Sequence, residues 1–174
     1  MKKLFFLFTL MFAFSIQSQV IITEIADPNN DTKARFIELT NIGDNAFDLT
    51  GYQLVRWTNA NTAYTTSSAV DLSEFGSLQS KGILTLANNT KFETVYSVAP
   101  TKVVGLQGPA DSNGDDNIAI LDPNGSIYDV YGVPGTDGTG QPHEFEDGRA
   151  ERKGSVTAPS STWDLNEWNI DNDA

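Results

Sequence analysis

Short segments in which apolar and polar residues alternate recur along the chain from residue 19 onward. In the segment RFIELTNIG, residues 35–43, an extended backbone places Ile37 and Leu39 on one side and Phe36 and Glu38 on the other. No stretch keeps an apolar period of 3.6 residues over three turns, and only 91–97 indicates a helical turn. We therefore predict strands in the segments 19–26, 35–43, 51–58, 82–88, 102–106, 117–122 and 126–132.

Turn signals separate these segments. Asp27-Pro28 ends the first segment, and Asn124-Gly125 lies between the last two, which is typical of a β-hairpin. About seven short strands without helices to cover a parallel sheet predict an all-β fold, an antiparallel immunoglobulin-like β-sandwich. A closed barrel is the alternative.

The C-terminal part of the chain differs in composition. Residues 132–144, GVPGTDGTGQPHE, contain four Gly and two Pro and predict a long loop. Order is expected to return in 145–156, and Trp163 and Trp168 are expected to close an edge or end of the sandwich. We therefore expect a sandwich over 19–132, with 133–174 as a loop and C-terminal extension that packs on it. The chain is either a small stand-alone protein or the front part of a longer one.

The first eighteen residues predict a cleaved signal peptide. Lys2 and Lys3 precede an uncharged, mostly apolar run over 4–16, which is short for a membrane span. Ser18 is a small residue at a plausible cleavage point, so the mature protein is expected to begin at Gln19. We expect a secreted protein, extracellular, on the cell surface or periplasmic, with no stable membrane span after cleavage.

Charge narrows the range of partners. The chain has 11 Lys plus Arg and 23 Asp plus Glu, and removal of two lysines leaves 9 − 23 = −14. Nucleic acids and anionic membrane surfaces are recognised largely through basic side chains, so neither is expected as a partner. A protein or cell-surface partner of unknown identity remains.

The sequence offers little for catalysis. It has no cysteine, which excludes thiol catalysis and Cys-based zinc sites, and no nucleophile elbow or phosphate-binding loop. His143 is the only histidine, and we expect it on the surface of a loop. Glu24 and Glu38 are expected to pair with Arg35 or Arg56, or to face solvent. No catalytic residue is predicted.

Asp and Asn recur at alternate positions in the stretch DSNGDD. Calcium prefers several carboxylate and amide oxygens on a tight turn, and Gly114 allows a sharp bend. Calcium is thus the one cofactor that the sequence suggests. The alternative is that these residues only form turns, because Asp and Asn side chains bond to the backbone two residues on. An EF-hand is excluded, since no helices flank the loop. The candidate metal ligands are Asp111, Asn113, Asp115 and Asp116.

Two weaker candidates complete the search. DPNND offers Asp27, Asn29 and Asp31 as a second Asp-rich turn. Tyr52 and Trp57 suggest an aromatic platform for a sugar, together with Tyr64, although the alternation places Tyr52 on the same face as the expected core residue Leu54.

Several of these segments, in this order, resemble the lamin tail domain. VIITEI and RFIELTN are similar to its first two strands, DLTGYQLVR to its third, GILTLAN to a later strand, and NGDDNIAILDPNGSIYDVYG to its closing hairpin. The resemblance covers roughly 20–132, and FEDGRAER is similar to a segment that follows this domain in secreted bacterial proteins. It implies an immunoglobulin-like sandwich without catalytic residues. The chain differs from nuclear lamins in its acidity and in lacking a coiled-coil rod, so chromatin binding does not carry over.

Together these features predict a secreted, non-catalytic lamin-tail-like β-sandwich that acts as a binding, adhesion or spacer module. The alternative is the accessory N-terminal part of a secreted hydrolase, most plausibly an endonuclease.

Overall fold

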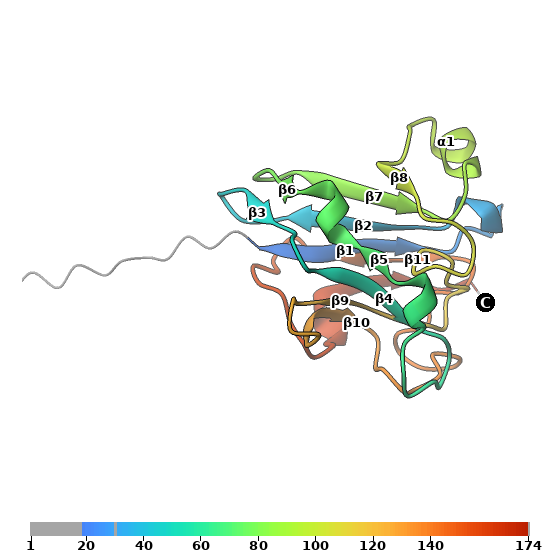
Figure 1. Cartoon of the computed structure of the whole chain (residues 1–174). Coiled ribbons are helices and arrows are strands. Elements are labelled where there is room, and N and C mark those ends of the chain that lie inside the picture. The colour runs from blue at the N-terminus through green and yellow to red at the C-terminus, as the bar shows by residue number, and fades with distance from the viewer. Residues whose placement is uncertain (1–18, 30, 174) are drawn as a thin grey trace, which may run out of the picture.

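The computed structural model describes residues 19–29 and 31–173, and shows two packed layers of mainly antiparallel strands (Figure 1). The predicted signal peptide, residues 1–18, lies outside the described residues. Each of the seven predicted segments contains a strand, and 91–97 contains the helix α1 (Lys91–Tyr96). The all-β, immunoglobulin-like sandwich is therefore confirmed.

The larger layer is a six-stranded sheet. Its pairs are antiparallel apart from the short β8, which runs parallel to β7. In spatial order its strands are β12 (Trp168–Asp171), β11 (Arg149–Arg152), β1 (Val20–Ala26), β2 (Phe36–Asn41), β7 (Ile83–Ala87) and β8 (Lys102–Val103).

The opposing layer is a four-stranded antiparallel sheet. A short ribbon joins β3 (Phe47–Asp48) to β6 (Ser77–Leu78), and single 3-10 turns connect several strands. The four strands are, in spatial order, β10 (Ile127–Tyr131), β9 (Asn117–Leu121), β4 (Gln53–Trp57) and β5 (Val70–Asp71). The 3-10 turns are η1 (Thr32–Ala34), η2 (Thr66–Ser68), η3 (Leu72–Phe75) and η4 (Leu165–Glu167).

The core lies between the two sheets and follows the alternation in the sequence. Ile37 and Leu39 of β2 face Leu54 and Ile118 of the other sheet, and all four are fully buried. On the outer face of the six-stranded sheet, α1 covers Phe36 with Phe92 and Tyr96, each ring about 5.2 Å from the Phe36 ring. Burial of large side chains such as these is the main favourable term in folding.

The C-terminal segment takes a larger part than sequence analysis expected. Strands β11 and β12 do not merely pack on the sandwich; they extend the six-stranded sheet beside β1, with Glu24 opposite Glu151. Phe145 and Trp168 lie in the main core. Residues 133–173 are thus an integral part of the sandwich.

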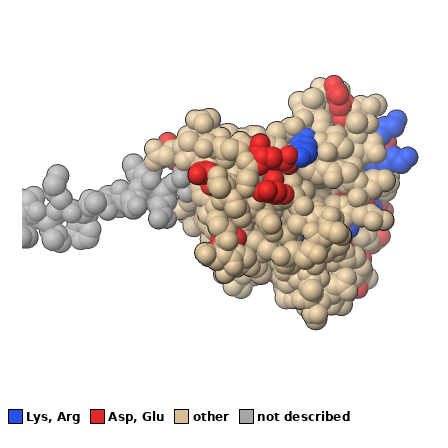
Figure 2. Space-filling view, viewed as in Figure 1, with Lys and Arg blue, Asp and Glu red and all other residues tan. Residues whose placement is uncertain are grey.

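Acidic side chains are unevenly spread over the surface. Figure 2 shows a group of acidic side chains on this face with a basic group beside it. Lys102 and Glu74, of η3, form an exposed ion pair. Among the described residues, no helix has the length and apolar character needed to cross a membrane.

Candidate functional site

Several loops meet at one end of the sandwich, which we call the loop end. They are 27–29 with 31–35, 58–69, 104–116 and 132–148, and they lie on the right in Figure 1. All four predicted metal ligands lie here, because β9 begins at Asn117, directly after them.

Arg56 of β4 is the centre of a buried charged network at the loop end. Its Nη1 donates to Oδ2 of Asp116 at 3.0 Å and also to the main-chain oxygen of Asp111. The backbone N–H of Asn59 donates to Oδ1 of Asp116 at 2.9 Å. Burial raises the pKa of Asp116, and the Arg56 guanidinium acts against that rise. A cationic side chain therefore already neutralises this carboxylate.

The Asp111 carboxylate is held in the same way. Its Oδ1 accepts from Asn88 at 2.9 Å and its Oδ2 from the backbone N–H of Gln107 at 2.7 Å. Arg35 lies 3.6 Å from Oδ1 and bonds at 2.5 Å to Asp27, a member of the second Asp-rich turn. Asp111, in loop 104–116, thus links this loop to the segment that contains Asp27 and Arg35.

Asp115 and Asn113 complete the predicted ligand set. Oδ2 of Asp115 accepts from Asn59 at 2.9 Å, its Oδ1 is buried without a hydrogen-bond partner, and Asn113 is exposed. Among residues 19–29 and 31–173, no group of three or more His, Asp or Glu side chains is arranged to hold a metal ion. Calcium binding remains a prediction. Arg56 bonds Asp111 and Asp116, two of the four predicted ligands, and would compete with a calcium ion for them.

Other Asp residues at alternate positions act in turns. Asp31 caps η1 by accepting from the backbone N–H of Lys33 at 3.0 Å. Asp122 accepts from the backbone N–H groups of Asn124 and Ser126, both at 2.9 Å, inside the predicted hairpin. The side chains of Asp31 and Asp122 are therefore explained by local backbone hydrogen bonds.

His143 is not on the surface, so that expectation was wrong. Only 2% of the residue is exposed, because loop 132–148 folds back against Trp163, whose ring centroid is 5.5 Å away. Tyr131 donates its hydroxyl to the main-chain oxygen of His143 at 2.8 Å, while Nε2 is buried without a partner. Burial lowers the pKa of His143.

The two early strand glutamates also have other partners than expected. Glu24 pairs with Arg149 of β11 at 3.4 Å, and Glu38 accepts from the hydroxyl of Thr23 at 2.6 Å. Arg35 and Arg56 are instead engaged by the loop-end aspartates.

The predicted aromatic platform is divided between the two faces of the four-stranded sheet. Tyr52 packs toward the core, edge-on to Tyr128 at 5.3 Å. Trp57 lies on the opposite face, against Tyr64 at 5.4 Å, and is only 7% exposed. The three rings do not share one surface.

The most buried ion pair among the described residues was not predicted from the sequence. Asp129 of β10 accepts from Arg152 of β11 at 3.1 Å and from the backbone N–H groups of Ile22 and Ser160 at 2.8 and 2.9 Å. Glu167 also bonds Arg152, at 2.5 Å. Burial raises the pKa of Asp129, opposed by Arg152 and both N–H groups. An Asp in the middle of the otherwise apolar segment IYDVY was the available signal.

Comparison with known proteins agrees with this fold. The family model of the Lamin Tail Domain matches residues 15–135, which is most of the chain. Curated proteins gave no match. The matched span contains β1 to β10 and every residue of the predicted metal loop. By its sequence and its sandwich architecture, this chain belongs to the Lamin Tail Domain family.

Proposed function

We propose that this protein is a secreted, non-catalytic binding, adhesion or spacer module. The observation that carries the proposal is the match to the lamin tail domain over 15–135. The loop-end network supports it, because Arg35 and Arg56 bond the aspartates that a catalytic or metal site would need to leave free.

The electrostatic character favours a protein or cell-surface partner. The net charge of −12 over the whole chain opposes contact with the phosphates of nucleic acid. Secretion rests on the apolar run in 4–16 and its two preceding lysines.

The test has two parts. Fractionation of the producing cells should place the protein outside the cytoplasm, and N-terminal sequencing should begin at Gln19. The purified protein should then leave DNA, phosphoesters and glycosides intact, with and without divalent metal ions. Metal-dependent DNA cleavage that is lost in a folded His143→Ala variant would instead favour a nuclease.

A further inference from the structure

Three glutamates form a row across the outer face of the six-stranded sheet. Glu151 of β11 lies opposite Glu24 of β1, which lies opposite Glu38 of β2. Like charges directly opposite on neighbouring strands destabilise a sheet. Glu151 and Glu38 both act to raise the pKa of Glu24, after burial. Arg149 lies 3.4 Å from Glu24 and 3.3 Å from Glu151, and offsets part of this repulsion.

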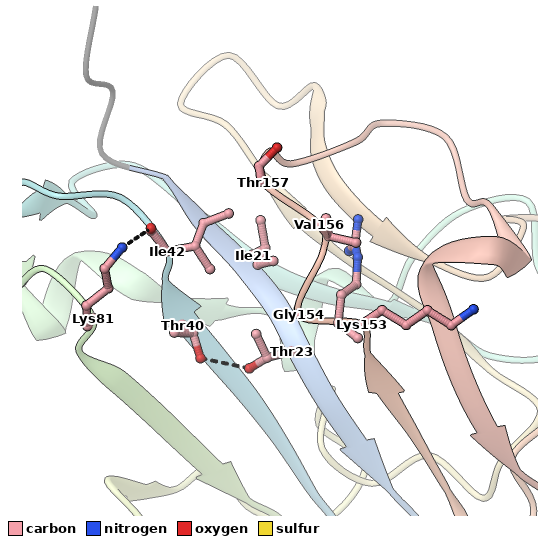
Figure 3. A pocket seen from close by; sticks show the side chains of 10 residues that line it. Ile21, Thr23, Thr40, Ile42, Lys81, Lys153, Gly154, Val156 and Thr157 are labelled. Carbon is pink, nitrogen blue, oxygen red and sulfur yellow. Dashed lines mark hydrogen bonds between the residues drawn. The ribbon is translucent and has the colours of Figure 1, made fainter.

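A hollow of about 350 Å³ lies on the same face, on one side of the row. Figure 3 shows it above β1, between the end of β2 and the chain that follows β11. Thr23, which donates to Glu38, joins the hollow to the glutamate row. Its lining is mainly aliphatic with hydroxyl groups: Ile21, Ile42, Val156, Thr23, Thr40 and Thr157.

The three cationic side chains that line it are already engaged, and Arg152 pairs with Asp129 and Glu167. Lys81 donates to the main-chain oxygen of Ile42 at 2.5 Å, and Lys153 donates to that of Asn166 at 2.8 Å. Ile83, opposite Thr40 on β7, is 52% exposed and extends the apolar surface beside the hollow. The hollow therefore suits an aliphatic side chain better than an anion.

A second hollow of about 260 Å³ lies beyond the glutamate row. The aromatic ring of Tyr96 lines it, and Arg149 is the one cation among its described lining residues. An aromatic wall beside several carboxylates suits a Lys or Arg side chain, which combines an apolar stem with a cationic head. The four carboxylates that line it belong to Glu24, Asp147, Asp171 and Asp173.

We propose that this sheet face binds an extended, basic peptide segment of a partner protein. The two hollows adjoin along β1, where Thr23 lines the first and Glu24 the second, and their outer ends at Ile21 and Ala26 are about 17 Å apart at 3.3 Å per residue. An extended segment reaches both hollows with an aliphatic residue and a Lys or Arg four positions apart, because side chains separated by an even number of residues lie on the same side. The inference rests on the proposed binding function and names the surface and the partner chemistry.

The negative charge of this face favours a basic peptide over an acidic peptide or a nucleic acid. The row and the second hollow together carry six carboxylates, on Glu24, Glu38, Glu151, Asp147, Asp171 and Asp173, against one guanidinium on Arg149. An acidic peptide or a nucleic acid would be repelled here. A basic side chain would relieve the repulsion between the glutamates, and would compete with the half-exposed Arg149 for them.

The test uses the full chain labelled with ¹⁵N and two seven-residue peptides with blocked termini. One peptide has leucine at position 2 and lysine at position 6, the other has these two residues exchanged, and all other positions are serine. Amide shifts should change at Ile21, Thr40 and Tyr96 on addition of one of these peptides to about 5 mM, with salt weakening the effect. A peptide with glutamate in place of lysine should not bind. Absence of shifts, or shifts confined to other surfaces, would overturn the proposal.

Variants separate the two hollows. Glu24→Gln and Glu38→Gln should each weaken binding about two- to fivefold, since each removes one half-buried charge contact. Glu74→Gln, which removes the same charge at η3, should leave it unchanged. Val156→Ser should abolish the preference for leucine over serine in the peptide while keeping the need for lysine. Equal effects of Glu24→Gln and Glu74→Gln would contradict a specific site.

Three further outcomes separate peptide recognition from a general cation site and from the proposed function. Spermine or calcium producing the same shifts as the peptide would show a general cation site and overturn peptide recognition. If no peptide binds but the protein is secreted and inactive toward DNA, this face is refuted while the binding-module function stands. DNA cleavage by the protein would refute the proposed function itself.

Discussion

Replacement of Asp129 by alanine should be among the most destabilising single changes in this protein. The substitution leaves the Arg152 guanidinium, whose side chain is 1% exposed, with only Glu167 as an anionic partner. It also removes the acceptor for the backbone N–H groups of Ile22 and Ser160. Breaking a buried ion pair from one side costs about 3–5 kcal/mol, because a buried charge loses its partner.

This loss is large against a total stability of about 5–15 kcal/mol for a typical domain. In a chain of this length it corresponds to a decrease in melting temperature of roughly 6–20 °C. Urea unfolding followed by tryptophan fluorescence measures it directly, and Trp168, whose ring lies 4.8 Å from the Arg152 guanidinium, should report on the site.

The matched control is Glu74→Ala, which removes a carboxylate from an exposed ion pair and should cost less than about 1 kcal/mol. Asp129→Asn keeps an acceptor oxygen of the same shape and should fall between the two. If Asp129→Ala costs no more than Glu74→Ala, the buried pair between β10 and β11 contributes no more to stability than an exposed one.

Three further predictions follow from the loop end. Burial lowers the pKa of His143 in the folded protein below the unfolded value near 6.5. The stability that this residue contributes is therefore present above pH 6.5 and is lost as the pH falls through the lower folded pKa. His143→Gln should remove this part of the pH dependence of the unfolding free energy. Gly132→Ala should destabilise by more than Gly140→Ala, because both glycines have positive φ but only at 132 would a Cβ lie 2.3 Å from Oδ1 of Asn117; equal losses in urea titrations would refute this. If the Asp-rich loop binds calcium, millimolar calcium should raise the melting temperature by a few degrees beyond ionic-strength-matched sodium and magnesium, and Asp115→Asn should remove the difference; equal effects of all three salts would mean that no calcium-specific site exists.

Local patterns in the sequence predicted the strands well. Ile37 and Leu39 alternate with polar residues and are fully buried, as a half-buried strand requires. The hairpin at Asn124-Gly125 was predicted from turn chemistry alone, and β9 and β10 pair on either side of it. These features depend on neighbours within a few residues, so the sequence contains them directly.

These local patterns do not predict contacts between residues that are distant in the sequence. The segment RAER has no strong strand pattern, and it becomes β11 because β1, more than a hundred residues away, offers an open edge. His143 is buried by Trp163 and Tyr131, which no local signal places beside it. The metal prediction counted oxygen-bearing side chains correctly, but Arg35, which precedes β2, and Arg56 of β4 come to the same loops only in the folded chain.

The place of β1 in the sheet has a consequence for the order of folding. This strand lies in the interior of the six-stranded sheet, with β2 on one side and β11 on the other. The first neighbour follows within about fifteen residues, whereas the second is separated by most of the chain. Contacts between distant segments raise contact order and slow folding. A chain that stopped at residue 135, where the family match ends, would expose the β1 edge as a site for pairing with other chains. The residues beyond the family match therefore cover an edge of β1 that would otherwise be open to pairing with other chains.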